Sequence, residues 1–477
     1  MKVKEKVSLQ MLQRIKQRIR TMWVGEGHET PGTEGKFTCG TLKYTPATLV
    51  TLFGWLLWGD FTLQMMETLP NLLVIQFKDH NISNSTMAIL LGSALTVCNL
   101  MLNPVYSSWS DRFRSRWGRR RPFLMVATPF VTLFLILIPW APNFTDAMMK
   151  IGWAHKFLTM FPATPIVLMF GILIVSFYIF NMFIITIYYY LIPDTVPNAF
   201  IGRFYGMFRL VSNAAGILFS WFVYGYAEQH MRLIFAIFAT LYAVSFIMMC
   251  WKVKEGAYPE IKEQHGHWYS PFMNYAKECF TIPRYWLIFM IYGCIGWAGS
   301  GGLFVMLFYR DDMGLTLTDY GRLIAVGSGA SLLLVVPAGI IVDRLGSQKS
   351  IITGLSGGLL VYVACFFAIH DRPTALVFGF MQFLPGVLLS LAILKWTVDM
   401  YPRAQYGQFA SAGSIVQAAG NAILLPLVGY AVDYFNNYYR ICLITPLIFY
   451  GFALIGSLIL YRLTRGRILS QETVSAV

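Results

Sequence analysis

The chain has 477 residues, of which 56% are hydrophobic and only 13% are charged, and its formal net charge is +14. Ordinary soluble domains carry about 25% charged residues, so this composition excludes an ordinary soluble fold and indicates a chain that lies in the lipid bilayer. A basic chain can also bind nucleic acid, but we expect no nucleic-acid partner here, because the basic residues stand in short loops beside long apolar stretches.

The first 44 residues are predicted to form a basic cytoplasmic tail ahead of the first apolar stretch. Within it, Leu12, Ile15, Ile19 and Met22 recur at helical spacing with arginine and lysine between them. This pattern predicts a short amphipathic helix on the inner membrane surface, although a disordered basic tail fits the same residues. Residues 1–30 contain no apolar core of the signal-peptide type, so we expect no cleaved leader.

Apolar stretches of about 20 residues, enough for a helix to cross a hydrocarbon core of about 30 Å, recur along the rest of the chain. They predict an all-α membrane protein with twelve transmembrane helices in two six-helix bundles. The bundles are residues 45–251 and 285–462, with a cytoplasmic loop at 252–284 between them and a cytoplasmic tail at 463–477. The predicted spans are 46–77, 87–108, 122–140, 165–191, 204–227, 232–250, 285–309, 321–342, 350–369, 374–397, 409–432 and 440–461.

Lysine and arginine are concentrated before the first span, after each even-numbered span up to the tenth, and after the twelfth. This is the positive-inside pattern, which predicts a multi-pass protein of the plasma or inner cell membrane with both termini in the cytoplasm. Glycosylation sequons at Asn81, Asn84 and Asn143 would then lie outside the cell. Such tripeptides are common by chance and do not decide between a bacterial and a eukaryotic membrane.

The two halves of the chain repeat their loop motifs. The segment "SDRFRSRWGRRRP" after span 2 and the segment "VDRLGSQKS" after span 8 both place Asp-Arg at a helix end with a glycine shortly after it. Duplicated six-span halves are typical of transporters whose site lies between the halves. A carboxylate beside guanidinium groups can hold helix ends together in one conformation and release them in another, although the same charges also serve as topology signals. The candidate gating residues are Asp111, Arg112, Asp343 and Arg344.

On these motifs the chain resembles the major facilitator superfamily over nearly its whole length, since "GIIVDRLG" fits the superfamily's loop motif Gly-x-x-x-Asp-Arg-x-Gly. The longer copy, "DRFRSRWGRRRPF", resembles the form found in the glycoside–pentoside–hexuronide:cation symporters, the melibiose permease group. Its "RWGRRRPF" portion is also similar to plant-type sucrose:proton symporters. The resemblance implies the fold of that superfamily and a sugar or glycoside as substrate.

A charged side chain near the middle of a bilayer costs about 2.5–3.5 kcal/mol, so the few charges within the spans are candidates for function. Span 1 carries Asp60, Gln64 and Glu67 on nearly one helix face, as expected for the wall of a hydrated cavity. Span 5 carries Arg209, and Asp60 is its predicted partner; together they offer acceptor oxygens and forked donors to hydroxyl groups. A structural ion pair at Asp60 and a merely solvated Glu67 are the alternative interpretations.

Trp58 and Tyr189 are candidate platforms for a sugar ring, although packing or interfacial anchoring explains any single aromatic residue as well. The melibiose permease resemblance implies further roles. "WGDF" is similar to the segment that bears the sugar-binding aspartate of that group, which corresponds to Asp60, and "RLVSNAAG" is similar to its arginine segment, which corresponds to Arg209. The tryptophan of its span 4 corresponds to Tyr189, and the lysine of its span 11 falls near Gln417.

The chain departs from that group at two sites. The second sugar-site aspartate of the group falls at or beside Ile185, where this chain has no acid. The two aspartates of its sodium site correspond to Asn99 and Asn103, a remnant cation site without the charge that holds sodium well. A coupling proton carried by Asp60 or Glu67 is therefore expected rather than sodium, because a low-dielectric cavity favours the protonated form of a carboxyl group.

The sequence thus predicts a secondary active transporter, a monomer, that moves a sugar or glycoside by alternating access, coupled to a proton. A uniporter or a carrier of another organic solute remains open, and a non-transporting membrane sensor is the alternative of a different class. We expect no enzyme, because the spans contain neither a His/Asp metal set nor a Ser-His pair. The seven cysteines show no metal-ligand spacing, so we expect no metal, no cofactor and no disulfide framework.

Overall fold

The computed structural model describes residues 37–39, 41–161, 163–256, 279–281, 283–402 and 405–475. The amphipathic helix predicted at residues 12–22 and most of the predicted loop at 252–284 lie outside these residues. The first described element is a β-hairpin of β1 (Phe37–Cys39) and β2 (Leu42–Tyr44), in which Phe37 pairs with Tyr44.

Eleven helical stretches of the described chain are long and apolar enough to cross a membrane. One of them, Ile201–Lys252, is 52 residues long and contains two helices, α9 (Ile201–Phe222) and α10 (Ala227–Lys252). The short 3-10 turn η3 (Tyr224–Tyr226) joins these two helices. Ten single crossings and this double one make twelve, so the prediction of an all-α membrane protein with twelve transmembrane helices is confirmed.

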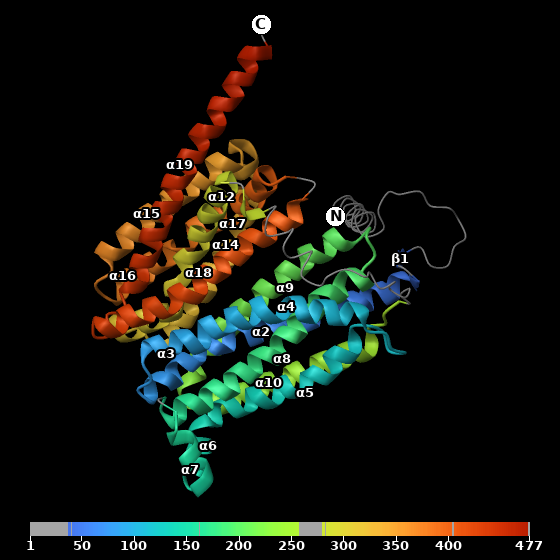
Figure 1. Cartoon of the computed structure of the whole chain (residues 1–477), viewed down its shortest axis with the longest axis vertical. Helices are drawn as coiled ribbons and strands as arrows, with labels where there is room; N and C mark the ends of the chain where they lie inside the picture. The colour runs from blue at the N-terminus through green and yellow to red at the C-terminus, as the bar shows by residue number, and fades with distance from the viewer. Residues whose placement is uncertain are drawn as a thin grey trace, which may run out of the picture.

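The first bundle consists of α9, α10 and four further spans. Its longest helix, α2 (Pro46–Asp79), begins after Thr45, whose side chain and that of Thr48 cap each other's backbone N–H groups. The second span is interrupted by the π-helical turn η1 (Ile89–Ser93), which joins α3 (Asn84–Ala88) to α4 (Ala94–Arg112). The remaining elements are α5 (Arg121–Leu137), η2 (Ile138–Trp140), α6 (Ala141–Met149), α7 (Gly152–Thr159) and α8 (Pro165–Thr195). The sequence analysis did not predict α6 and α7, which project from one end of the molecule in Figure 1.

The second bundle follows the same plan. Its first span is broken by the glycine-rich turn η4 (Ala298–Gly301) because glycine disfavours the helical state. Its last helix, α19 (Ile441–Ser475), continues well beyond the predicted end of span 12 at residue 461. The other elements are α12 (Pro283–Trp297), α13 (Gly302–Leu307), η5 (Phe308–Asp312), α14 (Leu317–Leu345), α15 (Ser347–Ala368), α16 (Arg372–Met381), α17 (Phe383–Met400) and α18 (Tyr406–Tyr434).

The glycines of the two repeated loop motifs share a backbone conformation. Gly118 has φ 108° and Gly346 has φ 80°, a region that side chains with a Cβ atom rarely adopt. At Gly118 there is also no space for a larger residue, because a Cβ atom would lie 2.6 Å from the carboxyl carbon of Glu255. The internal repeat therefore extends from the sequence to the local geometry of the loops.

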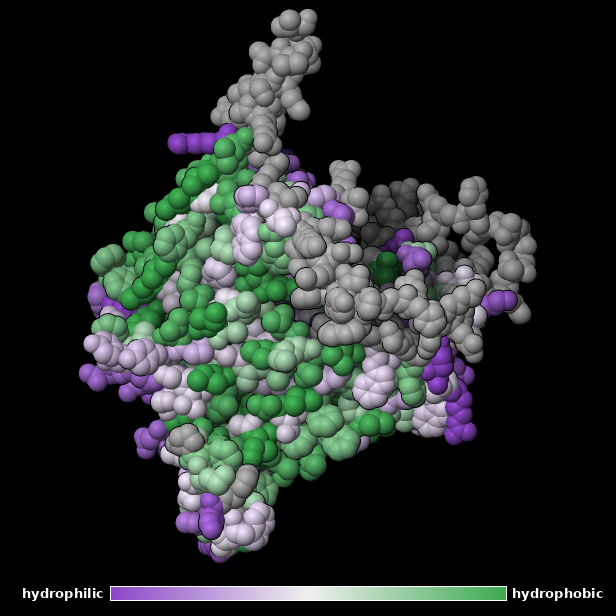
Figure 2. Space-filling view, in the orientation of Figure 1, coloured by the Kyte–Doolittle hydropathy of each residue, from purple (hydrophilic) through white to green (hydrophobic). Residues whose placement is uncertain are grey.

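Large hydrophobic side chains cover much of the outer surface (Figure 2). Leu333 on α14 is 79% exposed and Leu360 on α15 is 71% exposed. A monomer in water rarely exposes apolar surface on this scale, whereas lipid solvates it without penalty. The exposed apolar surface therefore agrees with the membrane-spanning assignment.

The two bundles touch at one end and diverge from it (Figure 1). Helix α18 packs against α3, η1 and α4, and α14 packs against α9 and η3. Because successive spans are antiparallel, the ends of the even-numbered spans lie together at the opposite end. We call the contact region the joined end, defined by Asn84, Gly225, Gly321 and Asp433. We call the opposite end the separated end, defined by Asp194, Glu255, Asp343 and Asp399.

Candidate substrate site and gates

Asp60 lies in the middle of α2, and only 1% of its surface is exposed. The hydroxyl of Ser212 on α9 donates a hydrogen bond to its carboxylate at 2.5 Å. One turn earlier on α2, the carbonyl oxygen of Leu56 accepts a hydrogen bond from the hydroxyl of the buried Tyr188 of α8 at 2.6 Å. Helices α2, α8 and α9 are thus tied together around one buried acid. A carboxyl group held in such a place without a paired cation is expensive for folding alone, which makes it a candidate for function.

Gln64 and Glu67 continue the polar stripe along α2. The side-chain amide of Gln64 donates to a carboxylate oxygen of Glu67 at 3.2 Å, and the Glu67 side chain is exposed. Coulomb interaction also links Glu67 with Asp60. The three residues that the sequence singles out on this helix therefore form one electrostatic group. The exposure of Glu67 is compatible both with a role in the site and with simple solvation.

The same side of α2 leads to the joined end. Asn71 forms a hydrogen bond with Tyr224 of η3, whose ring lies 5.6 Å from that of Tyr320 in the second bundle. Lys78 stands 18 residues, or about five helical turns, after Asp60, and its ammonium group donates to Asn437 across the bundle boundary at 3.2 Å. The stripe that begins at Asp60 within the first bundle therefore reaches the second bundle at Lys78.

Arg209 lies on an exposed side of α9. Among the described residues, its guanidinium forms no ion pair within 4.0 Å. The predicted direct pair of Asp60 and Arg209 is therefore not formed. The reason is the rotation of α9, which turns Ser212 toward Asp60 and leaves Arg209, three residues earlier, to interact with this acid only at longer range.

Tyr189 is brought to the same group. Its side chain is 39% exposed, and its ring centroid lies 6.0 Å from that of Phe208 on α9. The adjacent Tyr188, whose ring centroid lies 5.8 Å from that of Tyr189, is bonded to Leu56 of α2, so Tyr189 stands on the part of α8 that packs beside Asp60. An exposed aromatic face near polar side chains is typical of small-molecule sites.

The other two predicted contact residues, Trp58 and Gln417, lie on different bundles. Trp58 is 41% exposed and stacks on Phe61 with ring centroids 5.5 Å apart, at a spacing of three residues that continues to Gln64. Gln417 belongs to α18 in the second bundle, where its backbone carbonyl oxygen accepts a hydrogen bond from the indole N–H of Trp297 at 2.9 Å. In the described structure Gln417 makes no direct contact with the polar stripe of α2.

The two asparagines of the predicted remnant cation site, Asn99 and Asn103, both lie on α4. The side-chain oxygen of Asn103 accepts a hydrogen bond from the Thr186 hydroxyl of α8 at 3.1 Å, and Asn99, one turn earlier, is exposed. The described residues contain no cluster of three or more histidine, cysteine or acidic side chains that could hold a metal ion.

Asp433, near the end of α18, fastens the joined end. Its carboxylate accepts the backbone N–H groups of Asn84 at 2.9 Å and Ser85 at 2.8 Å, together with the Ser85 hydroxyl at 2.5 Å. The Asn84 side-chain amide donates to Asp433 at 2.7 Å and to Asn437 at 2.6 Å. A carboxylate of one bundle thus caps the N-terminus of helix α3 in the other. Asn84, noted above as a sequon, is 1% exposed and committed to this contact.

Glycines let the bundles approach at the same end. A Cβ atom on Gly429 would lie 2.6 Å from the carbonyl oxygen of Asn84, and one on Gly225 would lie 2.5 Å from the Thr318 hydroxyl. A Cβ atom on Gly321 would collide with the carbonyl oxygen of Ser220. These positions need glycine because the facing atoms are close to the backbone.

At the separated end, the acids bind within their own bundle. Asp194, at the end of α8, pairs with Arg119 at 2.6 Å and with Arg120 at 3.1 Å. The Glu255 carboxylate, just after α10, accepts the backbone N–H groups of Arg119, Arg120 and Arg121 at distances from 2.7 to 3.1 Å. The acids therefore tie α8 and α10 to the start of α5, all within the first bundle.

The candidate gating residues also lie at the separated end. Asp343 pairs with Lys395 of α17 at 2.8 Å, within the second bundle, and Arg344 is exposed. Asp111 and Arg112 are the last two residues of α4, and their side chains lie outside the described part of the structure. Their gating role therefore stays a prediction.

Comparison with known proteins decides the family. The profile of the Major Facilitator Superfamily matches residues 49–391 and 311–474, which together cover most of the chain. The chain belongs to the Major Facilitator Superfamily. It is accordingly a transporter of this type and not an enzyme.

Solved structures of this superfamily share the fold. A mutant form of the nucleoside transporter NupG superposes with a TM-score of 0.65 at 14% sequence identity over 86% of this chain and 98% of that one. The xylose transporter XylE from E. coli, in an inward-open conformation, gives 0.58 at 16% identity over 87% and 95% of the two chains. A bacterial homologue of the human lysosomal transporter Spinster, inward-facing and unoccupied, gives 0.61 at 12% identity over 87% and 98%. No curated protein sequence matches the chain.

Sequence reasoning about this Major Facilitator Superfamily transporter missed Ser212, Glu255 and Asp433. A signal was present at Asp433, which stands at the C-terminal end of α18, where the helix dipole disfavours a negative charge. An acid at such a position needs a cation or a helix N-terminus from elsewhere. Ser212 carried no comparable signal, because a serine in a span satisfies itself by bonding to its own helix, as it also does here with Phe208 at 3.0 Å.

Proposed function

We propose that this transporter carries a sugar or a glycoside and belongs to the branch of the superfamily that resembles the melibiose permease group and the sucrose symporters. The observation that carries the proposal is that buried Asp60 is bonded to Ser212, one turn from exposed Arg209 on α9, and lies beside the part of α8 that carries exposed Tyr189. Carboxylate acceptors, a guanidinium fork and an aromatic face together match the hydroxyls and the apolar face of a pyranose. Gln64 and Trp58 lie on the same helix as Asp60, and Gln417 would contact the substrate from the second bundle.

Proton coupling is the second part of the proposal. Asp60 has a neutral hydroxyl and no cation as its direct partner, so protonation would remove a charge that the folded bundle otherwise holds in a low-dielectric place. The positive charge of Arg209 acts on Asp60 at longer range and favours its ionised form. A substrate that rearranges the site would change this interaction and with it the tendency of Asp60 to release its proton. Glu67, exposed on the same stripe of α2, is the alternative proton carrier. The amides at Asn99 and Asn103 argue against sodium.

We further propose that the protein lies in the cell membrane with both termini in the cytoplasm, acts as a monomer and needs no cofactor. The arginine-rich separated end would then face the cytoplasm, as the positive-inside pattern requires. In this orientation the joined end would face the outside and the separated end the inside. Movement of the two bundles about the Asp60 region would expose the site alternately to each side.

The test is uptake of a labelled disaccharide into proteoliposomes, with and without an imposed pH gradient. Wild-type protein should accumulate the sugar only when the gradient is present, and Asp60→Asn should abolish this accumulation because an amide cannot release a proton. Asp79→Asn removes an exposed acid at the end of the same helix and is the matched control, for which accumulation should persist.

Three results would contradict parts of the proposal. Undiminished gradient-driven uptake by Asp60→Asn would remove Asp60 from the mechanism. Uptake that only equilibrates, whatever the gradient, would identify a uniporter. Transport of a nucleoside or a peptide in place of every sugar tested would refute the substrate class.

A further inference from the structure

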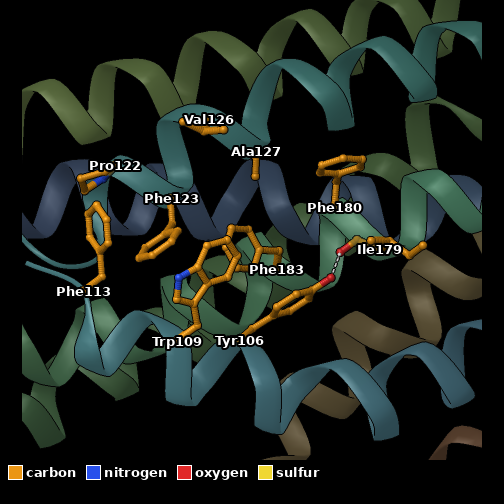
Figure 3. Close-up of a pocket in the computed structure, with 10 residues that line it drawn as sticks. All are labelled: Tyr106, Trp109, Phe113, Pro122, Phe123, Val126, Ala127, Ile179, Phe180 and Phe183. Atoms are coloured by element: carbon orange, nitrogen blue, oxygen red, sulfur yellow. Dashed lines mark hydrogen bonds between the residues drawn. The ribbon is translucent and has the colours of Figure 1, made fainter.

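An aromatic groove lies on the outside of the first bundle, between α4, α5 and α8 (Figure 3). Its volume is about 350 Å³, which falls within the range of small-molecule sites, roughly 300–1,000 Å³. Trp109 of α4 and Phe113, the residue directly after α4, point toward Phe123 of α5 and Phe183 of α8 in the close-up, with the Trp109 and Phe123 centroids 5.1 Å apart. The polar contact drawn there is the Tyr106 hydroxyl donating to the carbonyl of Ile179 at 3.3 Å. The lining of the groove is therefore suited to binding a hydrocarbon chain.

The groove opens on the surface that faces lipid. Trp109 is 56% exposed and Val126, on the opposite wall, is 64% exposed. The walls are rings packed edge to face, such as Phe123 against Phe183 at 5.4 Å, so side chains of the protein cannot collapse into the groove without disrupting these contacts. A flexible acyl chain from the bilayer can fill it at little cost, and the gain is van der Waals contact with the rings, since the chain leaves hydrocarbon and not water.

One end of the groove carries an exposed arginine. The loop that follows Phe113 returns to the groove at Pro122, so it runs around this end, and it contains five arginines. Of these, Arg119 and Arg120 pair with Asp194, whereas Arg116 forms no ion pair within 4.0 Å among the described residues. Arg116 is exposed, with its guanidinium carbon 5.9 Å from the ring centroid of the exposed Trp117. Exposed indoles beside a guanidinium are typical of the headgroup layer of a membrane.

We propose that this groove is a binding site for one anionic diacyl phospholipid, with an acyl chain against the rings and the phosphate headgroup on Arg116. Charge complementarity selects this occupant, because a zwitterionic lipid offers the same chains without a net charge to attract arginine. The site lies outside the proposed substrate site and is independent of the solute. Helix α4 lines the groove and is joined through η1 to α3, which Asp433 contacts at the joined end. A bound lipid would therefore contact the separated end of the same span that Asp433 contacts at the joined end.

The test is native mass spectrometry of the purified full-length protein with phosphatidylglycerol or phosphatidylcholine of identical acyl chains. Wild-type protein should retain one phosphatidylglycerol in preference to phosphatidylcholine. Arg116→Gln should lower the apparent affinity for phosphatidylglycerol about fivefold and leave that for phosphatidylcholine unchanged, since one surface arginine contributes about that factor toward anionic lipid. Val126→Trp, which places a large side chain in the groove, should weaken binding of both lipids.

Matched controls are Arg462→Gln, an exposed arginine of α19, and Leu333→Trp, an exposed apolar position of α14 in the other bundle. Both should bind phosphatidylglycerol as the wild type does. Because Arg116 lies in an exposed loop, its variant keeps the test valid even if Val126→Trp does not fold. Equal retention of the two lipids by wild-type protein, an unchanged affinity of Arg116→Gln for phosphatidylglycerol, or displacement of that lipid by inorganic phosphate alone would overturn the proposal.

Discussion

The joined end and the separated end use the same chemical device for different purposes. At both ends a carboxylate accepts the free N–H groups at the start of a helix: Asp433 caps α3, and Glu255 caps α5. Asp433 and α3 belong to different bundles, whereas Glu255 and α5 belong to the same one. A cap within a bundle stiffens a rigid body, while a cap between bundles must break if the bundles are to rock. Such a contact therefore acts as a scaffold when the carboxylate and the capped helix belong to one bundle, and as a gate when they belong to two. The strength of the hydrogen bonds does not decide this.

The largest effect is expected from Asp433→Ala, which removes four hydrogen bonds across the joined end. Hydrogen bonds to a charged group contribute about 1.5–3 kcal/mol each, so even one such contribution lost, about 3 kcal/mol, shifts the balance of the two conformations roughly 100-fold toward opening of this end. Distances between spin labels at positions 79 and 436 should lengthen. Asp371→Asn, at an acid of the same end whose side chain accepts hydrogen bonds from Thr374 within the second bundle, is the control and should leave them unchanged. Unaltered label distances in Asp433→Ala would show that this carboxylate does not gate.

The separated end should respond in the opposite way. Asp194→Asn weakens a pair in which the side chains of Asp194 and Arg119 are only 14% and 16% exposed. We expect a loss of about 2–3 kcal/mol in the free energy of unfolding, because a mostly buried guanidinium loses its counter-charge. The melting temperature should fall while the label distance at the joined end stays the same. A shift of that distance without loss of stability would mean that this cluster, too, is a gate.

A steric change at the joined end should have a smaller effect. Gly321→Ala places a methyl group against the carbonyl oxygen of Ser220 in the other bundle, and overpacking of this kind costs about 1–2 kcal/mol. The spin-label distance should lengthen in part of the population. Gly329→Ala lies on the same helix with no atom within 4 Å of the added carbon, so it should behave as wild type. Identical behaviour of the two variants would argue that the bundles are not in close contact there.

The smallest effect is expected from Lys395→Gln, which breaks the ion pair with Asp343. The two side chains are 38% and 78% exposed, and exposed pairs contribute about 0.5 kcal/mol. The melting temperature should change by no more than about 1 °C. A large change in uptake without a change in stability would instead support a gating role for Asp343.

Much of the fold could be predicted because it depends on local properties of the chain. Each apolar run had to be about 20 residues long, and the loop charges set the alternation of the spans. The candidate site residues were chosen on a local property as well: Asp60, Glu67 and Arg209 stand out as charges in apolar surroundings. The expected Asp60–Arg209 pair failed because a choice between Ser212 and Arg209, three residues apart on α9, depends on how that helix is rotated.

The sequence by itself determined the number of transmembrane helices, their grouping into two repeated halves and the residues too polar to lie in lipid without a purpose, since these follow from solvation of each segment. Only the tertiary structure decided which of these residues meet. Asp433 and Asn84 are 349 positions apart, and their contact depends on the relative placement of two rigid bundles. Hydrophobicity fixes where a helix lies in the membrane, but it says nothing about which neighbour satisfies a buried polar group.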